Sequence, residues 1–421
     1  MSQDEPHSSV PARTVTTTPH AVSNVSQPSA AGLAAALTVC MGVGPLSLYA
    51  LSALSPFVVS DLRLSGTQYG AVATVAFAVA AVSSLTFGRV ADVISGRRLM
   101  YLISAGAGLA LLLVAGAPNY MWLLFAVVLS GAAQSISNPV TNQLISSHVP
   151  EGQGLVMGVK QSGVQVSQFI AGLMFPALAL LVGWRWAMAS GVFLALLGVL
   201  FARAYVPVSV MARRRASDSR HGSQRLPAAV GWLTGYAFLV GFGLQATNVY
   251  LPLFAHEQVG LTAGVAGLTA AVAGFVGLVS RIAWGRFAER MSDPGVTLAV
   301  LGTLAVIGVI LVFLSGWLHW PLLLWPGTVL FGASALASNA VVMLALIRNV
   351  PVDSVGAASG VLATGLYVGF AGGPISFGLV ADASGAYLWT WLVPLVSFTL
   401  ALTAALGWRM TSQYKARLKF V

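Results

Sequence analysis

Long apolar stretches, separated by short polar or charged breaks, run through most of this sequence of 421 residues. About 20 apolar residues in a helix are enough to cross the hydrocarbon core of a bilayer. Hydrophobic residues make up 57% of the chain and charged residues only 8%, whereas about a quarter of a soluble domain is charged. The pattern therefore excludes a soluble protein and predicts an all-α integral membrane protein.

The polar breaks divide the chain into twelve predicted transmembrane helices. Their approximate limits are 30–57, 67–89, 98–117, 120–146, 153–181, 186–205, 228–254, 263–286, 296–316, 320–347, 354–381 and 386–408. Outside them we expect a disordered tail at 1–29, a flexible linker at 206–226 and a basic tail at 410–421. The third, sixth, ninth and twelfth spans are the least polar, which suits lipid contact.

The two halves of the chain, 30–205 and 227–409, contain similar short sequence motifs in the same order. The motif GRVAD at 88–92 recurs as GRFAE at 285–289, 197 residues later, and the Val-Pro pair at 149–150 recurs at 350–351. Parallel repeats of hydrophobic helices are a common plan among transporters. The sequence therefore predicts two six-helix repeats.

The charged break after the second span resembles the signature loop of the major facilitator superfamily, Gly-x-x-x-Asp-Arg-x-Gly-Arg-Arg. Gly88, Asp92 and Arg97 match it, although Val93 replaces the arginine after the aspartate and one extra residue precedes Gly96. The resemblance implies twelve helices in the major facilitator fold and transport by alternating access. It also implies a cytoplasmic gate, for which we expect the following residues: Gly88, Asp92, Arg97, Gly285, Glu289 and Arg290.

Basic residues predict the orientation. With the amino terminus inside, the inner loops and tails hold 17 arginines and lysines, whereas only Arg63 and Arg185 lie outside. Such a bias in short loops marks the cytoplasmic side. We therefore expect a multi-pass protein of the cell inner (plasma) membrane with both termini in the cytoplasm. Its net charge of +10 then indicates contact with anionic lipid head groups, not with nucleic acid.

Two basic residues lie inside predicted spans. Lys160 in the fifth span and Arg281 in the eighth are each about seven residues from the middle of their helix, roughly 10 Å below the midplane at 1.5 Å per residue. No Asp or Glu lies inside any span to pair with them. A basic residue at that depth costs several kcal/mol unless it is paired or hydrated. The alternative is that one or both extend to the inner head groups.

Amide side chains gather in the spans expected to face a cavity. Gln134, Asn138 and either Thr141 or Asn142 share one face of the fourth span. The amides that we expect to line a substrate site are Asn138, Asn142, Gln161, Gln165, Gln245, Asn248 and Asn339. Each could instead only join one helix to another by a hydrogen bond.

Several functions are disfavoured by residues that the core lacks. An embedded metalloenzyme or hydrolase needs His, Asp or Glu inside the spans, and all six histidines fall in tails, loops or span ends. Cys40 is the single cysteine, so no disulfide or thiolate metal site is expected. We therefore expect neither an enzyme nor a cofactor. A receptor with this many spans would leave the repeat unexplained.

The choice of substrate rests on resemblance within the superfamily. Proton-coupled drug antiporters should have an arginine where Val127 stands and a Gly-Pro pair in the fifth span, and both are missing. Arg281, followed by Gly285 and Glu289, is similar to the eighth-span arginine that binds the substrate carboxylate in monocarboxylate and oxalate–formate carriers. Those oxalate carriers have a second cation in the eleventh span, whereas Lys160 lies in the fifth.

These observations predict a monomeric secondary transporter of a small organic anion, such as a carboxylate. It would act as a proton symporter or as an exchanger with a counter-anion, with Lys160 and Arg281 binding the substrate's charge. A multidrug/proton antiporter is the alternative.

Overall fold

The computed structural model describes residues 29–90, 94–149, 152–208, 227–291, 293–351 and 354–418. These residues form helices joined by short connections, and they contain no strand. The helices are α1 Ala30–Val43, α2 Leu46–Ala53, α3 Ser55–Leu62, α4 Gly66–Val90, α5 Gly96–Ala115, α6 Tyr120–His148, α7 Gln153–Val182, α8 Trp184–Ser190, α9 Val192–Tyr205, α10 Ala228–Glu257, α11 Ala263–Arg290, α12 Pro294–Trp317, α13 Leu324–Asn349, α14 Val355–Ser384 and α15 Leu392–Leu418, with short 3-10 turns η1 Pro321–Leu323 and η3 Trp389–Trp391. The all-α membrane fold expected from the sequence is confirmed.

Among the described residues, eleven helices are long and apolar enough to cross a membrane, and the bent pair α1–α2 raises the number to as many as twelve. Helices are the expected solution because every backbone group inside a bilayer needs a partner within the protein. Short polar residues set their ends: Asn119 accepts a hydrogen bond from the Trp122 N–H at 3.0 Å and begins α6. Asp293 caps α12 in the same way, just ahead of Pro294.

The first span is not the continuous helix that its apolar sequence predicts. It breaks at Gly44-Pro45, and α1 and α2 meet there at 51°. Pro45 has no backbone N–H to donate and its ring crowds the preceding turn, so the helix cannot pass through it unchanged. Gly44 lies against α6, where an added Cβ would be 3.1 Å from the Ser137 hydroxyl.

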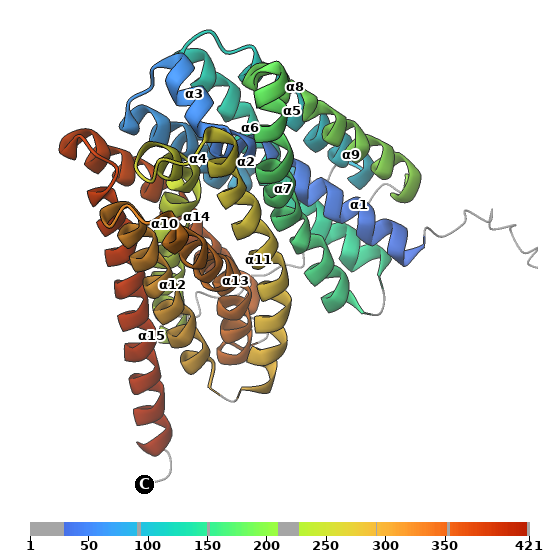
Figure 1. Ribbon diagram of the computed structural model, residues 1–421. Helices are drawn as coiled ribbons and strands as arrows, with labels where there is room; N and C mark the ends of the chain where they lie inside the picture. The colour runs from blue at the N-terminus through green and yellow to red at the C-terminus, as the bar shows by residue number, and fades with distance from the viewer. Residues whose placement is uncertain are drawn as a thin grey trace, which may run out of the picture.

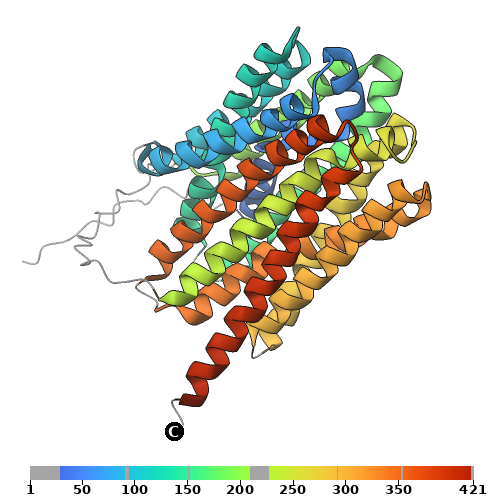
Figure 2. The same ribbon diagram turned by 90° about the vertical axis from the view of Figure 1, so that its left-hand side faces the viewer.

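The helices form two groups, which we call the N-terminal half (29–208) and the C-terminal half (227–418). The turns around α3 and α8 lie at one end of the bundle, the upper end in Figure 1. Helix α15 extends beyond the other helices at the opposite, lower end (Figure 2). The two halves converge at the upper end and diverge toward the lower end (Figure 1).

Glycines bring the two halves into backbone contact near the upper end. A Cβ on Gly70 of α4 would be 2.3 Å from the oxygen of Pro374 on α14, and one on Gly172 of α7 would be 2.1 Å from the nitrogen of Ala271 on α11. Neither distance could accommodate a side chain. The two contacts join α4 to α14 and α7 to α11, and they hold the upper end closed.

Glycines near the lower end have open space around them instead. A Cβ added at Gly154 or Gly158 on α7, at Gly285 on α11, or at Gly356 or Gly360 on α14 would meet nothing within 4 Å among the described residues. All five lie on helices, α7, α11 and α14, that are in backbone contact with the other half near the upper end. The bundle is therefore closed at one end only.

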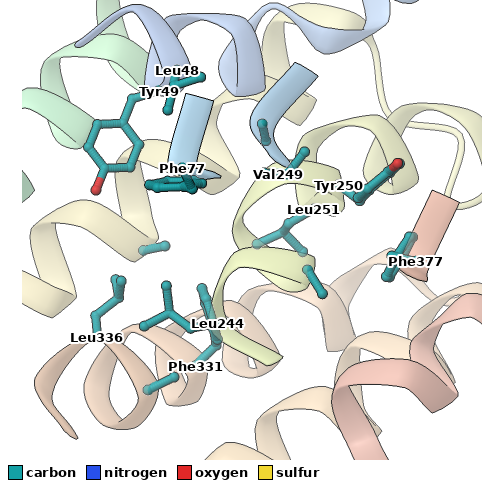
Figure 3. Packing of buried hydrophobic residues seen from close by; sticks show 14 of the residues in the cluster. Leu48, Tyr49, Phe77, Leu244, Val249, Tyr250, Leu251, Phe331, Leu336 and Phe377 are labelled. Carbon is teal, nitrogen blue, oxygen red and sulfur yellow. The ribbon is translucent and has the colours of Figure 1, made fainter. Parts of the chain in front are cut away.

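An aromatic core lies behind the closed end, mainly between α10 and α14. Tyr250 stacks on Phe377 with ring centroids 4.3 Å apart, and Trp391 meets Phe254 edge to face at 4.9 Å. Figure 3 shows Tyr250 and Phe377 in this cluster, with Phe77 of the N-terminal half nearby. Exposed apolar side chains are frequent on the least polar helices: Leu102, Leu109 and Leu112 on α5, Phe193, Leu196 and Leu200 on α9, Val300, Ile307 and Ile310 on α12, and Val396, Leu400 and Leu406 on α15.

Candidate functional site

Lys160 is buried on α7, with 1% of its surface exposed. Its Nζ donates to the Thr141 hydroxyl at 2.7 Å and to the Asn142 side-chain oxygen, both on α6. The helical spacing allowed either Thr141 or Asn142 to face inward, and both contact the ammonium. The Asn142 side chain is itself exposed, so the ammonium lies one residue from the surface.

Arg281 lies on α11 in the other half and is also anchored by oxygen atoms without charge. One guanidinium nitrogen donates to the backbone oxygen of Gln161 at 3.3 Å, and the other to that of Leu336 on α13 at 3.1 Å. Its Nε is buried and has no partner among the described residues. The guanidinium therefore has a donor left for a further ligand. Binding one would recover the roughly 1–3 kcal/mol that a buried, unsatisfied donor costs.

Neither cation forms an ion pair within the described residues. The ion pairs found there are Arg185–Asp61 and Arg409–Asp293, at opposite ends of the bundle. Arg281 donates to the backbone oxygen of Gln161, and Gln161 directly follows Lys160 in α7. The two cations are therefore linked through neighbouring residues of one helix. The centre of the protein thus carries two positive charges, one from each half, held only by neutral groups.

The expected amides divide into two layers. In the layer of the cations, the Gln161 side chain donates to Asn138 on α6 at 3.3 Å, and the Tyr367 hydroxyl of α14 lies close to Asn138. Nearer the upper end, Gln168 of α7 donates to the Asn248 side chain of α10 at 2.7 Å and joins the halves.

Gln165 lies between these layers. It is 2% exposed, its side-chain oxygen has no partner among the described residues, and it packs against Gly277 on α11. Asn339 on α13 is exposed, three residues beyond the Leu336 carbonyl that binds Arg281.

A cavity lies above the cations and is lined by α2, α4 and α10. It is small, with a volume of about 20 Å³, little more than one water molecule needs. Its lining includes Gln245 and Asn248 together with Ser52, Tyr49, Tyr69 and Phe77. Tyr49 lies close enough to Arg281 for the two groups to interact electrostatically. It therefore connects the cavity with the layer of the cations. Figure 3 shows Tyr49 beside Phe77 and Val249, which also line the cavity.

Tyr49, Tyr69 and Tyr367 are residues that the sequence reasoning did not select. It looked for charges and amides, whereas these tyrosines offer a hydroxyl on an apolar ring. Their position in the first, second and eleventh spans, together with the shortage of charge there, was the available signal.

Within the described part of the chain, no hydrogen bond or ion pair joins the expected gate residues across the halves. Arg97 donates to the Val206 oxygen within the N-terminal half. The backbone oxygen of Glu289 accepts from Arg348 of its own half at 2.9 Å, Arg290 is exposed, and Gly285 has open space around it. Gly88 lies in the last turns of α4, and Asp92 lies outside the described residues. The five described gate residues lie at the diverging lower end, and their gating role stays a proposal.

Known proteins share both the sequence pattern and the fold. The family model of the Major Facilitator Superfamily matches residues 37–374. The nitrite extrusion protein of Bacillus subtilis (strain 168) is 26% identical over 280 residues, which cover 62% of this chain and 66% of that protein, just under two thirds of its length.

Two solved structures show the same fold at low sequence identity. A bacterial homologue of the human lysosomal transporter Spinster, in an inward-facing and occupied conformation, superposes with a TM-score of 0.70 at 16% identity, covering 89% of this chain and 96% of that one. A variant of the nucleoside transporter NupG gives 0.73 at 14% identity, covering 89% and 99%. The family match covers most of the helical bundle, and the chain belongs to the major facilitator superfamily.

Proposed function

We propose that this protein is a secondary transporter that moves a small organic anion of the carboxylate class across the plasma membrane. The observation that carries the proposal is a pair of cations from opposite halves: Lys160, which is buried, and Arg281, which is half-buried with a buried Nε. They meet at Gln161 without an ion pair in the described structure. A site between the halves is the place where alternating access requires the substrate to bind.

The cost of the empty site supports an anionic ligand. Desolvated charges without partners are expensive, and the cost is relieved by water or by a charge of opposite sign. Arg281 has an unsatisfied donor, and a guanidinium can bind the two oxygens of a carboxylate through parallel hydrogen bonds. Lys160 adds a point charge. Together they favour a monoanion with two oxygens on one atom.

The relative named for nitrite extrusion supports the same chemistry. Nitrite is a bent monoanion with two equivalent oxygens, and in this respect it resembles the head group of a carboxylate. A guanidinium that can bind one can bind the other. The amides Asn138, Gln161 and Gln165 around the cations would then contact the substrate's oxygens or its uncharged part.

The charge pattern suggests which end of the protein faces the cytoplasm and whether transport is coupled to protons. The basic loops favour a cytoplasmic lower end, so the diverging end described above would open to the cytoplasm. The gate proposed from the sequence, Gly88, Asp92, Arg97, Gly285, Glu289 and Arg290, belongs to this end. No described contact gives Lys160 or Arg281 a carboxylate that could carry a proton. Anion exchange is therefore the simpler scheme, and in proton symport the proton would have to travel on the substrate.

Counterflow in proteoliposomes tests the proposal. Vesicles loaded with one unlabelled anion should accumulate the same labelled anion, across a panel of formate, acetate, lactate, oxalate and nitrite. Lys160→Met and Arg281→Met should each abolish the accumulation, and Arg286→Met, an exposed residue one turn further along α11, should not. Accumulation of lipophilic cations, with no response to any anion, would replace this proposal by drug efflux.

A further inference from the structure

Asp382 in the last turn of α14 binds the first turn of α4 in the other half. Its carboxylate accepts hydrogen bonds from the Ser65 hydroxyl at 2.8 Å, from the Gly66 N–H at 2.7 Å and from the Thr67 N–H at 2.9 Å. The Asp382 side chain is exposed at the upper end of the bundle. A single carboxylate therefore takes three donors from the opposite half.

Helix α4 does not need Asp382 in order to begin. Ser65 and Gln68 form a reciprocal capping box, in which the Ser65 hydroxyl accepts from the Gln68 N–H at 3.2 Å and the Gln68 side chain accepts from the Ser65 N–H at 3.0 Å. The N–H groups that this box leaves free, on Gly66 and Thr67, are the ones that reach Asp382. The carboxylate is thus a contact between halves, added to a helix that is already capped.

Gly66 gives both of its backbone polar groups to the C-terminal half. Its N–H goes to Asp382, and its carbonyl accepts from the Tyr250 hydroxyl of α10 at 2.6 Å. The backbones also touch, since a Cβ on Gly378 of α14 would be 2.4 Å from the Gly66 oxygen. Separation of α4 from α14 must break all of these contacts together.

The bonds to Asp382 depend on its charge. A carboxylate at a helix N-terminus gains from the helix dipole and from charge-assisted hydrogen bonds, and a protonated acid loses both advantages. The other titratable groups facing it are Tyr250 and Tyr387, with Glu257 close to Tyr387. Burial, with the charges of Glu257 and Asp382, raises the pKa of Tyr387 to about 12. Among the described residues no Arg or Lys forms an ion pair with Asp382.

We propose that Asp382 is a proton-sensitive latch between the halves. In its ionised form it holds the upper end closed, and protonation from the medium at that end releases α4 and favours the state that is open there. Protons would then regulate which conformation the protein occupies, separately from any proton that travels with the substrate. The proposal rests on membership of a family of transporters and does not require the anion assigned above.

Thiol accessibility measures the latch without any substrate. In a Cys40→Ala background, Ala73→Cys places a thiol in the cavity wall behind the latch, where Ala73 is 4% exposed. The probe is a membrane-impermeant methanethiosulfonate applied to the upper end, and Ser384→Cys, exposed at that end, corrects for the intrinsic reactivity of thiols with pH. The pH is varied from about 7.5 to about 3, because an aspartate ordinarily titrates at about 3.9 and the three donors further stabilise the ionised form of Asp382.

We expect the corrected labelling rate of Ala73→Cys to rise as the pH falls. Asp382→Asn should raise it at least about tenfold at neutral pH, because it removes the charge that strengthens all three hydrogen bonds. It should also remove the dependence of the rate on pH. Asp61→Asn is the matched control, because it removes a carboxylate at the same end whose partner Arg185 belongs to the same half. A rate that Asp382→Asn leaves unchanged, or a pH dependence that survives it, would overturn the proposal, whether or not any anion is transported.

Discussion

Arg281 on α11 donates a hydrogen bond to the backbone oxygen of Gln161 on α7, 3.3 Å away. Since Gln161 follows Lys160, the bond places the cation of one half against the turn that carries the cation of the other. It uses a backbone oxygen, so no substitution of the Gln161 side chain removes it. The charges must therefore be tested at Arg281 and at the surroundings of Lys160.

Arg281→Lys keeps the charge and removes the fork of donors. We expect the affinity for the transported anion to fall at least about tenfold, because an ammonium cannot make two parallel hydrogen bonds to one carboxylate. Titration calorimetry on the purified protein measures the dissociation constant. Arg286→Lys, on an exposed face of the same helix, should bind like the parent. Equal affinity in Arg281→Lys would mean that the guanidinium does not bind the substrate.

Asn142→Asp places a carboxylate on the Nζ of Lys160. The new ion pair should neutralise the lysine and weaken anion binding at least about tenfold, with folded protein obtained in the same amount. Ser146→Asp is the control, because it adds the same charge one turn further along α6, where Ser146 is exposed. If both variants lose affinity equally, the effect is general electrostatics and Lys160 has no special part in it.

Glycines at the two ends of α7 should respond differently to a side chain. Gly172→Val would overlap the backbone of Ala271 and should lower the melting temperature by several degrees. Gly158→Val has open space in this conformation and should melt like the parent. It should nevertheless lose transport, because a valine there would prevent the lower end from closing. Thermal unfolding in detergent and counterflow give the two readouts, and normal transport by Gly158→Val would remove Gly158 from the closing surface.

The orientation predicts which loops reach the outside. In the Cys40→Ala background we expect an impermeant thiol reagent on intact cells to label Asn119→Cys and Ser384→Cys and to spare Ser217→Cys. The bias of basic residues requires that the 206–226 segment be inside. The parent without cysteine provides the blank. Labelling of Ser217→Cys with protection of Asn119→Cys would reverse the assignment.

The sequence predicted the spans well because hydropathy depends on local composition. It missed the break at Gly44-Pro45, since a proline in an apolar run changes the backbone without lowering the hydropathy much. It selected the polar residues of the centre because polar side chains are conspicuous in such a chain.

Their pairing could not be predicted in the same way. Helical spacing allowed either Thr141 or Asn142 to face inward, and only the three-dimensional structure shows that Lys160 contacts both. Asp382 is at a span end, where a carboxylate is unremarkable, and its partner Ser65 is 317 residues away in the chain. Contacts of this kind depend on how the two halves pack against each other, and this packing cannot be predicted from a local sequence pattern.

The two cations differ in what happens to them when the halves move. Both acceptors of Lys160 belong to its own half and travel with it, whereas the bond from Arg281 to Gln161 crosses the halves and depends on how they are placed. If reorientation breaks this bond, an anion bound to Arg281 takes the place of the acceptor, and the loaded protein should then reorient faster than the empty one. The kinetic consequence is trans-stimulation: efflux of labelled substrate from vesicles should speed up when unlabelled substrate is supplied outside, and Arg281→Met should abolish that acceleration.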